Sequence, residues 1–394
     1  MRGYSFVVAL LLALVVAGAV ARAPLAGPPG VVIPDIGGMS PGYLGFCKAK
    51  PQFQKEWNCY LRNLLKVVDK ARDPATKLPQ LDILARQSGG FLEANCHMMM
   101  HVVGRTFARR HHVTLANLQK YLPLSNDPGC SAGFGMGMVM ALGAQITHGG
   151  VKGAYAMCSR APTRFREYTC FHSLGHAYMR YYDGYLSYGL KACRALGRVE
   201  APDCAQGVFH DYWLGLSGQD AARSTRGEPR TARVLCSRQH GIFVIGCWYR
   251  YYLAIPPKRT PSSALRIDSL CRGLTGLQRE GCVAAASLIS NANPFVQFTI
   301  CSRLKGADVD SCMRGVGTQD LPDAFASGLQ LIARCGSLGA SSRAGCYSWF
   351  GRTLSVLTDG RFAKQGCRSL SSRLGRAGCA AGARRMNAAL VTFV

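Results

Sequence analysis

The chain has 394 residues and carries 47 lysines and arginines against 21 acidic residues, a formal net charge of +26. Hydrophobic residues make up 48% of the sequence, which excludes a chain that stays disordered because it lacks a core. There is no G-x-S-x-G nucleophile motif, no P-loop and no dinucleotide-binding fingerprint. The sparse acidic residues also give little support to a hydrolase with paired carboxylates.

The first 23 residues have the layout of a secretory signal peptide. Arg2 supplies the positive charge, residues 6–17 form an apolar stretch, and small residues follow at Ala17, Ala19 and Ala21. The apolar run is about 16 residues, against roughly 20 in a membrane-spanning helix. We therefore expect a signal peptide over 1–23, a Pro- and Gly-rich linker over 24–45, and a secreted, periplasmic or cell-surface protein. Membrane attachment would require an uncleaved signal.

Export gives the 18 cysteines a specific meaning, because an even number in an oxidising compartment predicts disulfide bonds. Sixteen of them form pairs 11 or 12 positions apart, as in CRALGRVEAPDC and CRGLTGLQREGC. The predicted local bridges are Cys47–Cys59, Cys158–Cys170, Cys193–Cys204, Cys236–Cys247, Cys271–Cys282, Cys301–Cys312, Cys335–Cys346 and Cys367–Cys379. Cys96 and Cys130 are left to pair with each other; if they are free thiols instead, Cys96 becomes a candidate metal ligand.

The cysteine pairs recur with the period of a helical hairpin. From Cys158 onward the first cysteine of each pair returns after 35, 43, 35, 30, 34 and 32 residues, and a period near 35 is typical of α/α repeats. The segment 185–197 is rich in helix formers and ends in a glycine, and Asp203 is placed to cap a helix that begins at Cys204. Each bridge would then join two helices across their turn.

We therefore predict an all-α protein of disulfide-stapled α/α-hairpin repeats that form a solenoid. Histidine-rich helical repeats are expected over 46–235 and C-terminal cysteine-paired helical repeats over 236–394. One disulfide per α/α repeat, with the second cysteine often followed by a small residue and glycine as in CAQG, CMRG and CAAG, resembles the secreted cysteine-rich tetratricopeptide-like repeat proteins of some bacteria. The resemblance covers roughly 158–385 and implies an interaction scaffold or a periplasmic enzyme.

One long segment, GCSAGFGMGMVMALGAQIT over 129–147, carries no charge. It has the composition either of a membrane span or of a central helix. Gly133, Gly135 and Gly137 make it only weakly apolar and allow neighbouring helices to approach closely. We expect a central helix.

Histidines are concentrated in two similar motifs, CHMMMHVVG over 96–104 and CFHSLGHAY over 170–178. Each holds two histidines four positions apart, which share one face of a helix, and a further histidine has the same distance from Cys204 as His176 has from Cys170. Paired imidazoles on neighbouring helices are a known way to bind zinc, copper or iron. The candidate metal ligands are His97, His101, His172, His176, His210 and, one turn before His97, Glu93.

The competing interpretation is that these histidines pack in the core, with their ring nitrogens bonded to the backbone or to tyrosine hydroxyls. The spacing also contains a conflict. His97 and His101 lie one and five positions after a cysteine, whereas His172 and His176 lie two and six positions after one. This difference rotates one pair by about 100° around its helix relative to the other.

Three functions are compatible with these observations. The first is a repeat protein that binds a transition metal (Zn, Cu or Fe) or another ligand at the histidines. The second is a metal-dependent enzyme at the same residues, with Glu93 or Asp211 as proton carrier. The third is a structural scaffold whose arginines dock an anionic surface, an anionic polymer or an acidic protein. Nucleic acid is a poor candidate because the exported chain has no nucleic-acid motif.

The excess of basic residues predicts salt-dependent binding to anionic material. Arginines exposed on the surface should hold the protein on an anionic resin at low ionic strength, and added salt should release it by screening. Retention measured across a salt gradient checks this expectation. Retention that is equal at low and high salt would remove it.

Overall fold

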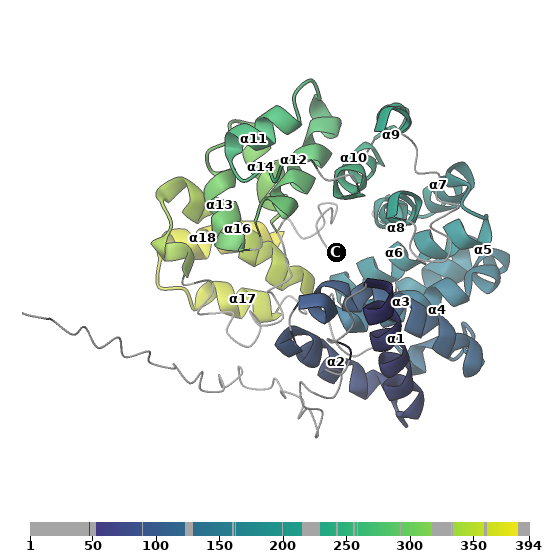
Figure 1. Cartoon of the computed structure of the whole chain (residues 1–394). Helices are drawn as coiled ribbons and strands as arrows, with labels where there is room; N and C mark the ends of the chain where they lie inside the picture. Colours follow the sequence, from purple (N-terminus) through teal and green to yellow (C-terminus); the bar gives the residue numbers. More distant parts are fainter. Residues whose placement is uncertain are drawn as a thin grey trace, which may run out of the picture.

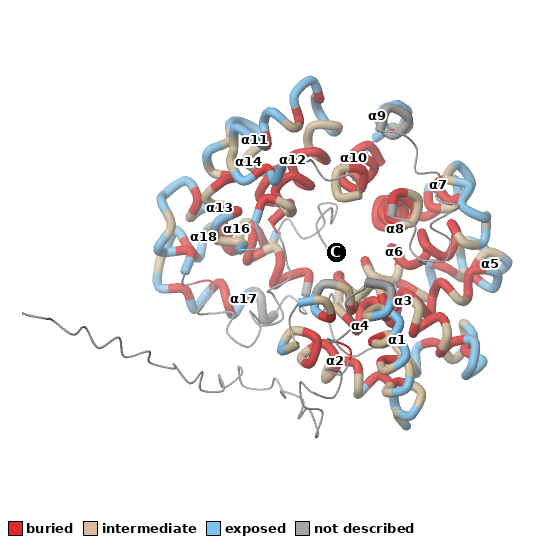
Figure 2. The backbone as a smooth tube through the Cα atoms, viewed as in Figure 1, coloured by how far each residue is buried: buried red, intermediate tan, exposed pale blue. Residues whose placement is uncertain are grey.

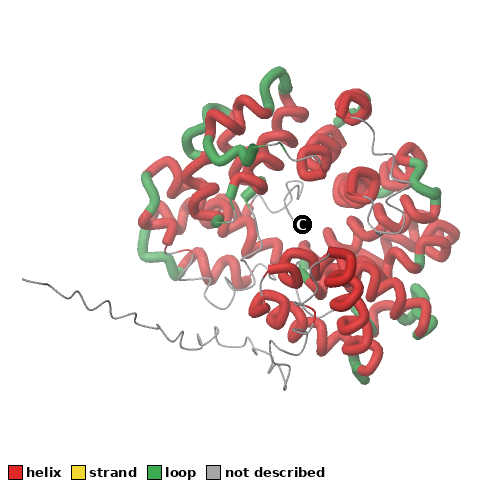
Figure 3. Tube along the Cα trace, in the orientation of Figure 1, coloured by secondary structure: helices red, strands yellow, loops and turns green. Residues whose placement is uncertain are grey.

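The computed structural model describes Cys47 and residues 53–384, apart from 89, 123–128, 160, 162, 199, 215–228, 242, 255–256, 258, 292, 317–331, 333 and 358–360. Every regular element over these residues is a helix (Figures 1 and 3), so the predicted all-α class is confirmed. The expected signal peptide and linker lie outside the described residues. The predicted division at residue 235 stays a prediction.

The helices in chain order are α1 (Phe53–Lys70), α2 (Pro74–Ser88), α3 (Gly90–Arg110), η2 (Leu118–Lys120), α4 (Cys130–Ala141), α5 (Gly143–Cys158), α6 (Arg164–Tyr181), α7 (Leu186–Arg194), α8 (Glu200–Leu214), α9 (Pro229–Ser237), α10 (Phe243–Ala254), α11 (Ala264–Leu270), α12 (Gly276–Ser290), α13 (Pro294–Cys301), α14 (Ala307–Arg314), η3 (Cys335–Ser337), α16 (Ala340–Leu357), α17 (Arg361–Arg368) and α18 (Arg373–Arg384).

All nine predicted disulfide bonds are present, and together they use all 18 cysteines. Seven of them join one helix to the next across the intervening turn, from α5–α6 to α17–α18. The long bridge, Cys96–Cys130, joins α3 to α4. Nine bridges indicate an oxidising compartment. Because Cys96 is bridged, it is not a candidate metal ligand.

The second helices of the seven turn-bridged hairpins, together with α3 and α4, form a continuous series. We call α3, α4, α6, α8, α10, α12, α14, α16 and α18 the core helices; each contacts the next along this series. Burial is densest on α4, α6, α8 and α10 (Figure 2). One apolar core extends from Cys47 to Cys379. Helix α16 also contacts α6, so the path of the chain in Figure 1 turns back toward its first half.

Glycines let α3 and α4 pack with their backbones in contact. A Cβ atom on Gly133 would lie 2.1 Å from the carbonyl oxygen of His97, and one on Gly137 would lie 2.2 Å from that of His101. Both distances are far below van der Waals contact, so only glycine fits at these positions. The close approach expected for the uncharged segment is confirmed, and it places the backbone of both α3 histidines against α4.

The α6–α8 pair has the same kind of contact. A Cβ atom on Gly207 would lie 1.9 Å from the carbonyl oxygen of His172, and one on Gly175 would lie 2.1 Å from that of Cys204. Similar contacts recur further along the core helices, at Gly281, Gly315, Gly351 and Gly382. The backbones of α6 and α8, which carry three of the histidines, are therefore in direct contact.

No single helix over the described residues is long and apolar enough to cross a membrane. Helices α4 and α5 pass that test only as a pair, and they are bent by 90° at their junction. All residues of α4 except Ala141 are buried within the protein. The central-helix interpretation of this segment therefore fits the packing.

The prediction that Asp203 caps a helix beginning at Cys204 is wrong. Helix α8 begins at Glu200, and Asp203 lies in its first turn with 1% of its surface exposed. The Asp203 carboxylate pairs with the guanidinium of Arg164 on α6 at 2.5 Å. Burial raises the pKa of Asp203 to about 7, and Arg164 opposes the shift. The carboxylate thus joins two core helices instead of ending one.

Replacing Gly207 with alanine should destabilise the protein, because the new methyl group would meet the carbonyl oxygen of His172. Overpacking of this kind costs about 1–3 kcal/mol or more, since two backbones must separate. The free energy of unfolding, measured by denaturant titration with disulfides intact, checks this. The matched control is Gly153→Ala in α5, where a Cβ atom meets nothing within 4 Å. Equal stability of the two variants would contradict backbone contact between α6 and α8.

Candidate metal centre

The five histidines selected from the sequence meet in one place, contributed by α3, α6 and α8. Their ring centroids form a continuous series: His97 to His101 is 4.8 Å, His101 to His176 is 5.5 Å, His176 to His172 is 4.8 Å, and His176 to His210 is 5.3 Å. We call these five residues the histidine cluster. The two H-x3-H motifs therefore form one cluster and not two separate core contacts.

The conflict in helical phase is resolved by the packing of α3. This helix is not the second helix of a turn-stapled hairpin, because its Cys96 bridge runs to α4. Helix α4 packs on both α3 and α6, and its glycines allow a close approach. The α3–α4 pair thus has its own geometry, and an offset counted from Cys96 does not compare with one counted from Cys170.

Most of the cluster is inaccessible to solvent. His101, His172 and His176 have no exposed surface and His210 has 3%, whereas His97 is half-buried. Two expected participants lie further out. Glu93, in the first turn of α3, is exposed and is not a member of the group that could hold a metal ion. The side chain of Asp211 is 17% exposed and lies at the edge of the cluster.

Three of the histidines could hold a metal ion, since the ligand atoms of His172, His176 and His210 lie within 4.8 Å of one another. His172 Nε2 is 3.4 Å from His210 Nδ1. An ion bound at 2.0–2.1 Å in tetrahedral geometry separates its nitrogen ligands by about 3.4 Å. Two of the three ligands thus already have the required spacing, and rotation of the His176 side chain would bring in the third.

Groups outside the triad face the nitrogens that would not bind the metal. The hydroxyl of Tyr168 lies 3.2 Å from His172 Nδ1, and the carboxylate of Asp211 lies 3.8 Å from His176 Nδ1. Such outer partners orient metal-binding imidazoles and fix which nitrogen carries the proton. With Nδ1 protonated toward Tyr168, the lone pair of His172 Nε2 is directed at His210.

His176 is the least satisfied residue of the cluster. Over the described part of the chain, neither of its ring nitrogens has a hydrogen-bond partner, although the side chain is fully buried. A buried polar atom left without a partner costs about 1–3 kcal/mol. His176 therefore does not fit the alternative of satisfied core histidines, although His97, bonded to the carbonyl of Gly129, and His172, bonded to the hydroxyl of Tyr168, do fit it.

Burial keeps these histidines neutral. The pKa values of His101, His172, His176 and His210 are lowered well below 6.5, first by desolvation and then by nearby positive groups, which for the last three include Arg250. Neutral imidazole is the form that binds metals, because its lone pair is free. Each of these imidazoles therefore has one nitrogen with a lone pair at neutral pH.

Two residues of the site were not found from the sequence. Tyr168 lies four positions before His172 and so shares its helix face, a signal that was present in the sequence. Arg250, buried in α10, hydrogen-bonds to Tyr168. No local pattern marks Arg250, because it comes from a helix that follows the histidine-rich segment.

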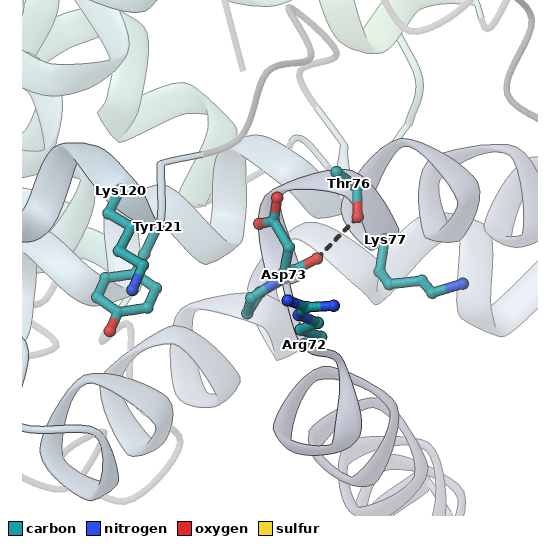
Figure 4. A pocket seen from close by; sticks show the side chains of 7 residues that line it. Arg72, Asp73, Thr76, Lys77, Lys120 and Tyr121 are labelled. Atoms are coloured by element: carbon teal, nitrogen blue, oxygen red, sulfur yellow. Dashed lines mark hydrogen bonds between the residues drawn. The ribbon is translucent and has the colours of Figure 1, made fainter.

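A separate cavity, lined by no histidine, lies at the start of α2. It has a volume of about 510 Å³ and is lined by Arg72, Asp73, Pro74, Thr76, Lys77, Lys120 and Tyr121 (Figure 4). Three of these side chains are cationic and one is acidic, and the Lys120 ammonium lies over the Tyr121 ring. Cationic side chains of this kind attract anions, and the lining has none of the imidazole or thiolate ligands that transition metals prefer.

No protein-family model, curated protein or solved structure matches this chain. The resemblance to secreted tetratricopeptide-like repeat proteins accordingly stays a prediction.

The lowered pKa values predict a protein that loses stability in mild acid when no metal is bound. The unfolded histidines take up protons below pH 6.5 while the buried ones do not, so stabilisation is complete above that pH and is lost as the pH falls. Each neutral histidine contributes a slope of up to about 1.4 kcal/mol per pH unit. Unfolding of chelator-treated protein, measured from pH 7 to pH 5, checks this.

Asp203 opposes this trend, since its raised pKa favours the folded state as the pH falls. The comparison that isolates the histidines is therefore between the wild type and His176→Phe, which should have a shallower slope. His148→Ala, at an exposed position of α5, should match the wild type. Equal slopes for the wild type and folded His176→Phe between pH 7 and pH 5 would show that His176 is not held neutral by burial.

Proposed function

We propose that this protein is an exported metal-binding protein, a solenoid of disulfide-stapled α/α hairpins that holds a transition-metal ion at its histidine cluster. The single observation that supports this most strongly is His176. It is fully buried, has two ring nitrogens without hydrogen-bond partners over the described residues, and belongs to a three-histidine group with ligand atoms within 4.8 Å. An ion bound by this group would satisfy one nitrogen of His176 directly, and Asp211 is placed to satisfy the other.

The donor atoms restrict the kind of metal. All cysteines are in disulfides, so no thiolate is available, and the group consists of imidazole nitrogens. Imidazole suits Zn²⁺, Cu²⁺ and Fe²⁺, whereas Mg²⁺ and Ca²⁺ prefer oxygen ligands. We propose one of the first three as the physiological ion, with His97 and His101 as further members of the site and Glu93 on the exposed side of α3 as an outer carboxylate.

A metal-dependent enzyme at the same residues is a second candidate. Three protein ligands leave one coordination position for water or substrate, as in catalytic zinc sites. Asp211 supports this alternative, because its partly exposed carboxylate lies 3.8 Å from His176 Nδ1 and could carry protons. The complete burial of His172 and His176 instead favours holding the ion over access by a substrate.

Docking of an anionic partner is the third candidate. The basic cavity at the start of α2 supports it, since Arg72, Lys77 and Lys120 border a space large enough for an anionic group (Figure 4). This function would be independent of the histidine cluster. An anionic surface, an anionic polymer or an acidic protein would bind in a salt-dependent way without any metal.

Metal content tests the proposal. Protein purified without a polyhistidine tag from an oxidising compartment should contain about one Zn, Cu or Fe per chain, or should take one up after chelator treatment. His176→Ala and His210→Ala should each lose the ion, because each removes one of three ligands. Elemental analysis of the purified protein measures the outcome.

His148→Ala is the matched control, because His148 is exposed and lies in α5 outside the triad. Circular dichroism and the disulfide content establish that each variant is folded. A wild-type protein that cannot be loaded with any of the three metals would refute the proposed function. So would triad variants that are folded and bind metal as well as the wild type.

A further inference from the structure

The proton positions of His97 can be worked out from its neighbours. Its Nδ1 lies 3.2 Å from the backbone carbonyl oxygen of Gly129, which can only accept a hydrogen bond. His97 Nδ1 must therefore carry the proton that is donated to Gly129. In neutral imidazole the other nitrogen, Nε2, is then an acceptor with a lone pair.

This tautomer determines that of His101. His101 Nε2 lies 3.0 Å from His97 Nε2, so one of these two nitrogens must donate to the other. Because His97 Nε2 is the acceptor, His101 Nε2 carries the proton. The lone pair of neutral His101 is then on Nδ1, and over the described residues this fully buried nitrogen has no hydrogen-bond partner.

The ring of His101 also packs against that of His176, with centroids 5.5 Å apart and an angle of 73° between the ring planes. His101, with its unpartnered Nδ1, thus lies next to the residue on which the proposed metal site depends. We infer that His101 Nδ1 is a fourth nitrogen ligand of the ion held by His172, His176 and His210, and that His97 is a positioning residue that fixes the tautomer of His101. This inference rests on the proposed metal site.

Four protein ligands change what the site does. Structural metal sites have four protein ligands, whereas catalytic sites keep one position open for water or substrate. A closed set of four imidazoles holds the ion without exposing it to a reactant. Over the described residues only His172, His176 and His210 have ligand atoms within 4.8 Å of one another, so the ring of His101 would have to move toward them on binding, while its bond to His97 keeps Nδ1 unprotonated.

Cobalt substitution distinguishes three ligands from four. Chelator-treated protein is titrated with Co²⁺ and followed by its visible absorption, which is intense for four-coordinate Co²⁺ and changes with pH where one of the four ligands is a water that ionises. The wild type should give an intense spectrum that does not change with pH, with one ion per chain. His101→Phe fills the space of the ring without a nitrogen, so water should take the fourth position and its Co²⁺ should bind more weakly, with a spectrum that changes with pH.

Two further variants test whether His97 fixes the tautomer of His101. His97→Leu should keep the intense spectrum but lose about 10–100-fold in Co²⁺ affinity, as is typical when the partner of a metal-binding histidine is removed. His97→Gln should recover most of that loss, because its amide can donate to Gly129 and accept from His101. His148→Ala should match the wild type, and circular dichroism reports the fold of every variant.

The possible outcomes separate this inference from the proposed function. If the wild type binds Co²⁺ with the intense spectrum and folded His101→Phe has the same spectrum and affinity, His101 is not a ligand, although the metal site stands. Two ions per chain, one of them lost in His101→Phe, would also overturn the inference, because His97 and His101 would then bind an ion of their own. If the wild type binds no Co²⁺ at all, both the proposed metal site and the inference that His101 is a ligand are refuted.

Discussion

Contact between glycine and the backbone of the next helix sets the spacing of the core helices. At Gly133, Gly137 and Gly207 the facing atoms are the carbonyl oxygens of His97, His101 and His172. A Cβ atom at any of these positions would overlap the facing oxygen, so any other residue would push the helices apart. These contacts hold α3 against α4 and α6 against α8, and α4 also packs on α6, so imidazoles on α3, α6 and α8 meet. The candidate metal site therefore depends on glycines that are not among its ligands.

The disulfide bonds support this packing from outside. Seven of them hold the turns between consecutive helices, and chain entropy makes each 12-residue loop worth about 2.8 kcal/mol. Glycine within a helix is unfavourable by about 1 kcal/mol relative to alanine, so core helices rich in glycine need such support. Bridged turns and glycine contacts thus offset the cost of burying His176, which has no hydrogen-bond partner over the described residues.

Much of this could be predicted from the sequence, because it depends on local spacing. The 11–12-residue separation of cysteines predicts the eight turn bridges, and elimination then leaves Cys96 with Cys130. The histidine motifs predict their own shared helix faces. Where the prediction went wrong, a tertiary contact had overridden a local preference: Asp203 pairs with Arg164 instead of capping α8. Arg250 could not be found, since only the stacking of α10 on α8 brings it to the cluster.

The most direct test of the account is the position of the metal in a crystal of the loaded protein. An anomalous-difference map, collected at the absorption edge of the bound metal, locates the ion without reference to any assumed ligand. The account predicts one dominant peak between α6 and α8, about 2.0–2.1 Å from a ring nitrogen of each of His172, His176 and His210. A peak only at surface residues would contradict the account, as would a map without a peak in which both nitrogens of His176 are bonded to protein or water.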